Sequence, residues 1–336
     1  MPTTVAADHR RRRPPSPPTT VARSTVPHPR RFRFAVELHH PFEGRSWTDT
    51  AREAEQLGYA TAFFPDHLDE GPGPLSAITW CAAVTTELRV GALVLDCDFR
   101  HPAILARELA TIDAASGGRL EVGLGAGWKT LDYTQTGIPM DRPGVRVSRM
   151  LEHLQVLRGL WSEGEFSFSG EHYRIDALDG TPAPHAIGGP PILIGGGAPR
   201  LLRAAGALAD IVGVNASIHS GEIDQAAAHD GLAERIDEKV SWVRDGAGDR
   251  FDDLELNAWL AAAELTDDPS VPAMLAELFG TDVESFRSSP LALVGSESDC
   301  AEQLHERRER WGYSYHVIPG DRAHDFAPLV QRLTGT

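Results

Sequence analysis

The sequence predicts a (β/α)8 barrel, an α/β fold in which eight parallel strands alternate with helices. Short apolar runs that fit strands buried on both faces occur eight times. Segments with helical spacing of apolar residues separate most of these runs, and several runs end in glycine or polar residues. The eight strands are expected in Phe32–Leu38, Ala60–His67, Leu88–Asp96, the first part of Leu120–Trp128, Pro191–Gly197, Asp210–Asn215, Leu254–Leu260 and Tyr313–Gly320.

Helices are expected between these strands. Pro102 suits a first helical turn, and the pair Gly117-Gly118 follows the same helix where a C-cap is expected. The helix after the fourth strand carries an apolar stripe, including Met150 and Trp161. The expected segments are Trp47–Leu57, Leu75–Thr86, Pro102–Ala115, Arg146–Trp161, one beginning near Pro199, Glu222–Val243, Val271–Phe279 and Asp299–Trp311.

One segment does not fit the alternating pattern. Between the fourth helix and the fifth strand, Ser162–Pro190 contains FSFSGEHYRI, whose alternation predicts a short hairpin. The domain organisation is then simple: residues 1–31 form a Pro/Arg-rich extension expected to be disordered, and residues 32–336 form one barrel domain.

Composition excludes several function classes. Residues 1–31 carry a net charge of +6, so the remainder carries −22, which disfavours nucleic-acid binding. There is no run of 18 apolar residues, so no membrane span is expected. The three cysteines form no CxxC motif, which disfavours a disulfide framework or a structural zinc site and fits a cytoplasmic protein.

Candidate catalytic residues follow from the barrel geometry, because the active site of such barrels lies at the carboxyl ends of the strands. Asp66 and His67 end the second strand, and a histidine beside a carboxylate can exchange a proton near neutral pH. The alternative is a loop histidine that caps the next helix. His39 and His40 follow the first strand and either line a substrate pocket or lie in solvent.

Glycines mark a second candidate feature. Gly195, Gly196 and Gly197 precede a helix, where free backbone amides attract anions and Arg200 would add positive charge. The same cluster also fits an ordinary tight turn. No P-loop, HExxH or GxSxG motif occurs, and no metal-ligand spacing is present, so no metal is expected.

Several segments together resemble the luciferase-like monooxygenase superfamily, in particular its branch that uses coenzyme F420. The resemblance runs from about Phe32 to the C-terminus, and the order and spacing of its segments carry it. These are FRHPAILARELATIDAASGGRLEVGLGAGW, GIPMDRPGVRVSRMLEHLQVLRGLW, FSGEHYRI, PPILIGGGAPRLLRAAGALADIVGVN, SPLALVGSESDCAEQL and RWGYSYHVI.

The resemblance implies a barrel of the bacterial-luciferase type with an insertion before strand 5. It also implies a cofactor, F420 or alternatively FMN, at the strand carboxyl ends. A non-proline cis peptide behind the cofactor matches Leu93–Val94 best. The proton-handling role falls on His67, with Asp66 beside it. The cofactor-binding positions implied after strands four and five are Gly125, Gly127, Trp128, Gly195, Gly196 and Gly197.

Two departures bear on the substrate. Trp128 stands where the F420-dependent glucose-6-phosphate dehydrogenases have an acidic residue, and Asp132 replaces a glutamate common among relatives. The expected function is hydride transfer between F420 and a small organic substrate in a pocket walled by His39, His40, Trp128 and the hairpin. The alternative is an oxygen-using FMN monooxygenase, which would need a flavin reductase. A homodimer is expected from the resemblance.

Overall fold

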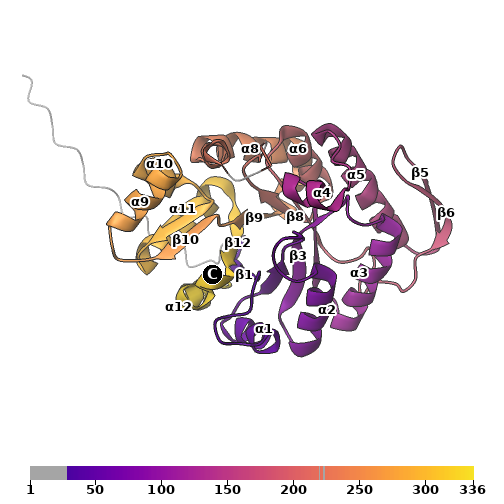
Figure 1. Cartoon of the computed structure of the whole chain (residues 1–336), viewed down its shortest axis with the longest axis horizontal. Helices are drawn as coiled ribbons and strands as arrows, with labels where there is room; N and C mark the ends of the chain where they lie inside the picture. The colour runs from indigo at the N-terminus through magenta and orange to yellow at the C-terminus, as the bar shows by residue number, and fades with distance from the viewer. Residues whose placement is uncertain (1–28, 219, 222–223) are drawn as a thin grey trace, which may run out of the picture.

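The computed structural model describes residues 29–218, 220–221 and 224–336, and eight parallel strands close into a barrel (Figure 1). The order around the barrel is β1-β12-β9-β8-β7-β4-β3-β2. The (β/α)8 prediction and all eight predicted strands are confirmed. The barrel strands are β1 (Arg33–Glu37), β2 (Thr61–Phe64), β3 (Arg89–Asp96), β4 (Leu120–Gly125), β7 (Ile192–Gly196), β8 (Ile211–Val214), β9 (Glu255–Trp259) and β12 (Tyr313–Pro319).

Helices surround the barrel and cover its outer face (Figure 1). Local signals fix several of their ends: Pro102 begins one helix, and Gly117 ends it with a φ of 71°. Another helix begins with a capping box between Ser296 and Asp299. The helices are α1 (Trp47–Gln56), α2 (Pro74–Val84), α3 (Pro102–Ser116), α4 (Thr130–Thr136), α5 (Pro143–Leu160), α6 (Pro199–Leu208), α7 (Gln225–Asp230), α8 (Ala233–Ala247), α9 (Ser270–Leu278), α10 (Val283–Ser288), α11 (Glu297–Trp311) and α12 (Ala323–Leu333).

The helix predicted over Glu222–Val243 is two helices in the structure. Residues 222 and 223 lie outside the described residues. Asp224 caps α7 by accepting a hydrogen bond from the Ala227 amide, and α7 ends at Gly231. A Cβ at Gly231 would lie 2.8 Å from a terminal methyl carbon of Leu291, so a larger residue would crowd that side chain where the two helices separate.

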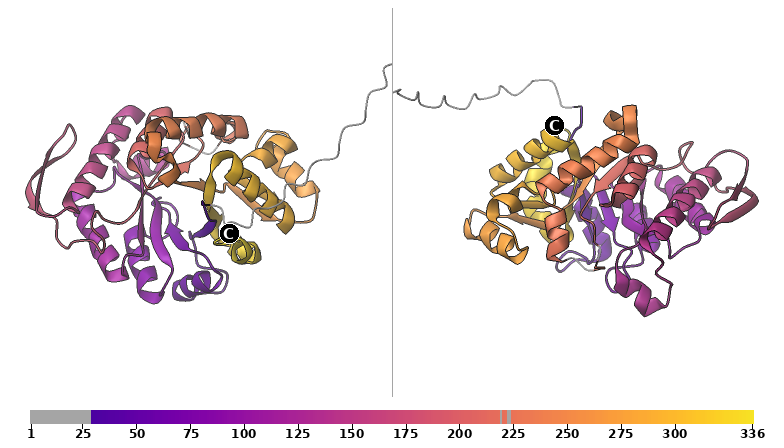
Figure 2. Two further views of the ribbon diagram at one scale, coloured as in Figure 1. Left: turned by 180° about the vertical axis from the view of Figure 1, so that it is seen from behind. Right: turned by 90° about the horizontal axis from the view of Figure 1, so that it is seen from above.

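Two excursions leave the barrel at opposite ends of its longest axis (Figures 1 and 2). One is the predicted hairpin, in which β5 (Glu165–Ser169) pairs antiparallel with β6 (Arg174–Asp179). The other was not predicted: β10 (Ala262–Leu265) pairs in parallel with β11 (Ala292–Gly295), and α9 and α10 lie between them in sequence. Because only two residues separate the end of β9 from the start of β10, the sequence shows one continuous apolar run there.

The chain contacts the barrel before the predicted domain start at Phe32. Arg30 donates a hydrogen bond to the Leu254 carbonyl at 2.5 Å, and its guanidinium lies 5.2 Å from the centroid of the Phe251 ring. The rest of the predicted extension, residues 1–28, lies outside the described residues. No helix in the described part of the chain has the length and apolar character needed to cross a membrane.

An ion cluster closes the amino-terminal end of the barrel. Arg33 pairs with Glu255 at 2.5 Å and with Glu121 at 2.6 Å. Arg89 donates a second hydrogen bond to Glu121 at 2.6 Å. The Tyr315 hydroxyl donates to the other oxygen of Glu121 at 3.0 Å, and the tyrosine ring stacks 3.5 Å from the Arg33 guanidinium. The cluster therefore ties together β1, β3, β4, β9 and β12.

Removal of Arg33 should destabilise the barrel. The substitution Arg33→Ala would leave the buried Glu121 with one partner fewer and strip Glu255 of its bidentate partner. The expected loss is about 3 kcal/mol of unfolding free energy, measured by urea denaturation. The matched control is Arg31→Ala at an exposed position, which should change stability by less than about 0.5 kcal/mol. Equal stability of the two variants would contradict the structural role of the cluster.

Candidate active site

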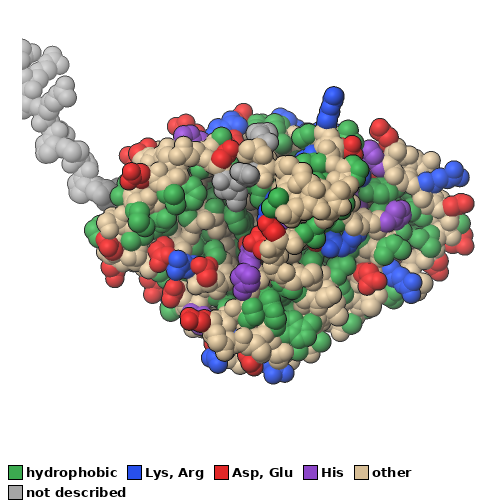
Figure 3. All heavy atoms as spheres, viewed as in Figure 1, with side chains coloured by type: hydrophobic (Ala, Val, Ile, Leu, Met, Phe, Trp, Pro, Cys, Tyr) green, Lys and Arg blue, Asp and Glu red, His purple; other side chains and the backbone are tan. Residues whose placement is uncertain are grey.

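The carboxyl end of the barrel is hollow. Figure 3 shows a recess near the centre of the face seen in Figure 1, with histidine and acidic side chains beside it. Helix α4 crosses in front of the barrel on this face (Figure 1). Every predicted site residue belongs to a strand end or to a loop that opens on this end of the barrel.

Strand β3 contains a bulge in its carboxyl-terminal half. The peptide bond between Leu93 and Val94 is cis, as the resemblance implies, and the pairing of β3 with β4 shifts between Ala92 and Leu95. Both residues of the cis bond are half-buried. A Cβ at Gly125 would lie 2.5 Å from Val94, so this glycine makes room for the bulge.

Gly195 differs from the glycines around it. A Cβ there would meet nothing closer than 3.7 Å, where it would touch Val94. Gly196 and Gly197 are crowded instead, because a Cβ would lie 2.3 Å from Leu201 and 2.5 Å from the Asn215 carbonyl respectively. Packing within the chain therefore explains two of the three glycines, whereas a Cβ at Gly195 would make only ordinary van der Waals contact with Val94.

The helix that follows this turn begins without a side-chain cap. Ala198 is the N-cap of α6, and its methyl side chain makes no capping hydrogen bond. The first amides of such a helix attract an anion such as a phosphate. Arg200 does not point its charge at this end, since its guanidinium donates to the Gly144 carbonyl and the Ser148 hydroxyl, each at 2.8 Å.

His67 has a carboxylate partner other than its sequence neighbour. Its Nδ1 lies 2.8 Å from Oδ2 of Asp132, and the Leu68 amide donates to Oδ1 of the same carboxylate at 3.1 Å. The imidazole also stands edge-on to the Trp128 ring, with the centroids 5.2 Å apart. Its Nε2 makes no hydrogen bond within the described part of the chain. A fixed Nδ1 with a free Nε2 is the arrangement expected of a proton-transfer histidine.

Asp66, which the sequence analysis placed beside His67 in the catalytic pair, makes its hydrogen bonds to other residues. It is buried, and both of its oxygens accept from Arg100, at 2.5 and 2.8 Å. The Asp96 amide donates to it as well, at 2.9 Å. The structure thus corrects the pairing: Asp66 joins the ends of β2 and β3, and Asp132 orients His67.

A buried acidic cluster supports the loop after β4. The Tyr133 hydroxyl lies 2.8 Å from Asp96 and 3.0 Å from Asp98. A Cβ at Gly127 would lie 1.8 Å from this hydroxyl, so the cluster itself requires the glycine, whose φ is +74°. Arg146 of α5 donates to the carbonyls of Ala126 and Gly127, at 2.9 and 3.2 Å. The packing of this cluster therefore explains why residue 127 is glycine, independently of any cofactor.

The two histidines after β1 have different environments. His39 lies between two glutamates, with Nε2 3.3 Å from Glu37 and Nδ1 3.3 Å from Glu70. The hydrogen bond to Glu37 raises the pKa of His39 against the opposing effect of burial, and the charges of both glutamates add to the rise. Trp259 donates its Nε1 hydrogen to Glu37 at 2.6 Å. His40 is exposed and makes no hydrogen bond or ion pair with the described residues.

Sequence reasoning missed several of these positions. Glu37, a carboxylate at the end of an otherwise apolar strand, was the signal for the contact to His39. Trp259 is the last residue of β9, where barrel geometry places site residues, whereas Asn215, which directly follows β8, was already expected at the carboxyl end of its strand. In the described ranges, 29–218, 220–221 and 224–336, no three His, Cys, Asp or Glu side chains are grouped so that they could hold a metal ion.

Comparisons with known proteins fit this geometry. The model of the luciferase-like monooxygenase family matches residues 30–237. The chain belongs to this family. An F420-dependent glucose-6-phosphate dehydrogenase from Nakamurella multipartita is 31% identical over 196 residues, or 55% of this chain and 56% of that protein. The pyrimidine monooxygenase RutA from Variovorax paradoxus is 35% identical over 132 residues, or 39% of this chain and 34% of that protein.

The chain thus spans about half the length, or less, of the curated relatives it matches. Among solved structures, coenzyme F420-dependent tetrahydromethanopterin reductase from Methanopyrus kandleri has a TM-score of 0.70 at 19% identity. That alignment covers 90% of this chain and 98% of the reductase. It places this chain in the same fold.

The acidic cluster should make stability depend on pH. Burial raises the pKa of Asp96 to about 6, whereas an unfolded aspartate titrates near pH 4. The folded state therefore binds the proton of the Asp96 carboxyl more tightly than the unfolded state does. The resulting stabilisation of the fold is fully present below pH ~4 and is lost as the pH rises through about 6.

The variant Asp96→Asn should not lose stability in this way, because asparagine does not titrate. Its unfolding free energy relative to wild type should rise between pH 4 and pH 7, by on the order of 3 kcal/mol. Thermal unfolding across this range measures the effect, with Asp253→Asn at an exposed carboxylate as control. A difference between Asp96→Asn and wild type that does not change with pH would show that Asp96 is ionised in the folded protein throughout.

Proposed function

We propose that this chain is an F420-dependent oxidoreductase that transfers hydride between the deazaflavin and a small organic substrate. The observation that carries the proposal is His67, which is held by Asp132 on one nitrogen and free on the other, at the mouth of the barrel. The names of the F420-dependent relatives support the cofactor. Bound F420 would supply a two-electron hydride carrier that reacts poorly with oxygen.

The residues present fit such a cofactor. Leu93 and Val94 would support the ring system from behind, and Gly195 places no side chain over Val94. The uncapped first turn of α6 would receive the phosphate of the cofactor's side chain, after the turn formed by Gly196 and Gly197. Gly125, Gly127 and Trp128 would border the same site from the loop after β4.

His67 would manage the proton that accompanies the hydride. In the direction of carbonyl reduction, its Nε2 would donate a proton to the substrate oxygen. In the direction of alcohol oxidation, it would accept that proton. Asp132 would orient the imidazole and hold the hydrogen at Nδ1, because its carboxylate lies 2.8 Å from that nitrogen. His39 would form the wall of the substrate site opposite, whereas the exposed His40 would contribute little.

An FMN-dependent monooxygenase is the second candidate, and the similarity to RutA favours it. Such an enzyme would need molecular oxygen and a partner flavin reductase, which the F420 reaction does not. In both cases the partner is a small-molecule substrate, and neither nucleic acid nor membrane is required. A homodimer and a cytoplasmic location stay predictions from the resemblance.

Anaerobic turnover tests the proposal. Reduced F420 and the enzyme are mixed with a panel of aldehydes, ketones and activated alkenes, and oxidised F420 is followed by its absorbance. The proposal predicts enzyme-dependent oxidation with stoichiometric product in the absence of oxygen. Product that forms only from reduced FMN and oxygen would overturn it in favour of the monooxygenase.

Substitutions at the histidine pair test the proton role. His67→Ala should lower kcat by about 10²- to 10⁴-fold while F420 binding stays unchanged, because only proton transfer is lost. Asp132→Asn should lower kcat less and shift the pH profile, since the imidazolium loses its negative partner. The control is His324→Ala on the surface of α12. Full turnover by His67→Ala with normal cofactor binding would remove the proposed role.

A further inference from the structure

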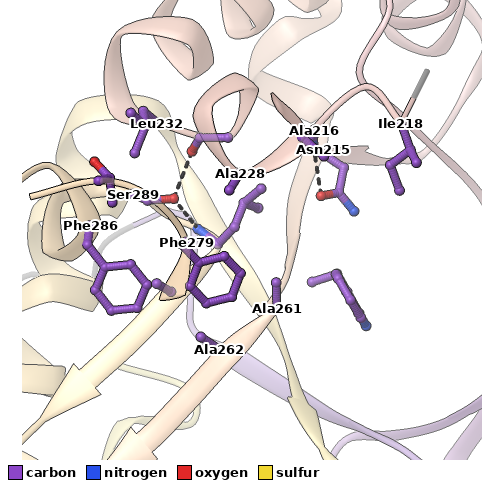
Figure 4. Close-up of a pocket in the computed structure, with 16 residues that line it drawn as sticks. Asn215, Ala216, Ile218, Ala228, Leu232, Ala261, Ala262, Phe279, Phe286 and Ser289 are labelled. Atoms are coloured by element: carbon purple, nitrogen blue, oxygen red, sulfur yellow. Dashed lines mark hydrogen bonds between the residues drawn. The ribbon is translucent and has the colours of Figure 1, made fainter. Parts of the chain in front are cut away.

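A side pocket of about 70 Å³ opens beside the barrel mouth (Figure 4). It lies between the carboxyl ends of β8 and β9, helix α7 and the excursion that contains α9, α10, β10 and β11. Sixteen residues line it: Asn215, Ala216, Ile218, Ala227, Ala228, Gly231, Leu232, Trp259, Ala261, Ala262, Phe279, Thr281, Phe286, Ser289, Leu291 and Ala292.

The chemistry of this lining is apolar. None of the sixteen residues is charged. Phe279 and Phe286 stack with their ring centroids 5.6 Å apart. The Ser289 hydroxyl donates to the Gly231 carbonyl at 2.7 Å and accepts from the Leu291 amide at 3.2 Å, so it is satisfied within the protein (Figure 4). The pocket therefore offers its occupant mainly aliphatic and aromatic surface.

Part of that surface is still open to solvent. Ile218, Leu232 and Phe279 are only half-buried although their side chains are hydrophobic. An apolar ligand would cover them and gain the free energy of removing this surface from water. A closed packing defect would instead bury these side chains completely.

Two lining residues connect the pocket to the candidate active site. Trp259 is the last residue of β9 and donates its indole hydrogen to Glu37, which also contacts His39. Asn215 directly follows β8, and its backbone carbonyl borders Gly197 of the glycine turn. The side-chain oxygen of Asn215 accepts from the Ala216 amide at 2.9 Å, whereas its Nδ2 makes no hydrogen bond within the described residues. A polar donor thus stands where the apolar pocket meets the barrel mouth.

We propose that this side pocket binds the apolar arm of a neutral substrate whose reacting group is a carbonyl or hydroxyl. The inference rests on the proposed function for the identity of the occupant as substrate. Asn215 Nδ2 would donate to a polar atom between the arm and the reacting carbon. A phosphorylated arm is excluded, because its charge would lose hydration among aromatic rings without any lining cation to replace it. The substrate class therefore differs from the glucose 6-phosphate of the named relatives.

A ketone series tests the pocket directly. Binding of 2-butanone, 2-pentanone, 2-hexanone, 2-heptanone and 2-octanone to the full-length protein is measured by ligand-observed NMR, without cofactor. Affinity should rise about fourfold for each added methylene until the pocket is full. Glucose 6-phosphate should not compete.

Two matched substitutions of alanine by phenylalanine test whether the chain-length dependence arises in this pocket. Ala228→Phe fills the pocket and should abolish the dependence of affinity on chain length. Ala226→Phe adds the same side chain to an exposed position of the same helix that does not line the pocket, and should leave the dependence intact. Thermal unfolding and F420 titration of both variants establish that they are folded.

The outcomes separate this inference from the proposed function. A chain-length dependence that Ala228→Phe removes supports the pocket, even if F420 does not bind and the proposed function fails. Equal affinity along the series, or identical behaviour of the two phenylalanine variants, would overturn the pocket. Competition by glucose 6-phosphate would overturn it as well, even where F420 turnover is observed.

Discussion

The charged cluster around Arg33 is the interaction on which the rest of the structure depends. It joins five strands at the amino-terminal end of the barrel and closes that end with paired side chains. The carboxyl end is built in the opposite way, with glycine at positions such as Gly195 and Gly213 and a β3 bulge at Val94. Because small residues face the interior there, the barrel keeps a recess that side chains would otherwise fill. The interactions that stabilise the barrel and the recess that could hold a ligand therefore lie at opposite ends of the same strands.

The chemistry at the recess depends on which residues its carboxylates bind. Asp66 is fully used by Arg100 and the Asp96 amide, which fixes β2 to β3. Asp132 comes from the helix after β4 and takes the role of orienting His67. Trp128 stands edge-on to the imidazole. An indole beside His67 makes the surroundings of the imidazole less polar, which agrees with the apolar lining of the side pocket beyond Trp259.

The sequence predicts the barrel well because periodicity reports burial, and each of the eight strands is buried on both faces. It also predicts the hairpin and the place of the cis peptide bond. It fails where the signal is not local. The strand β10 merges with the apolar run of β9, and the partner of His67 lies 65 positions away along the chain. Adjacent residues such as Asp66 and His67 point to different neighbours, because side chains at a strand end are directed by the loops that reach them. The apolar pocket could not be predicted either, since it combines residues from ranges that are far apart along the chain: 215–218, 227–232, 259–262 and 279–292.

The identity of the cofactor is the central claim, and equilibrium binding tests it most directly. Oxidised F420 and FMN are titrated side by side into the purified protein, and the dissociation constants are compared. The account predicts micromolar or tighter binding of F420 and much weaker binding of FMN. The reverse order of affinities would contradict it, and the recess with His67 would then belong to an oxygen-using flavin enzyme.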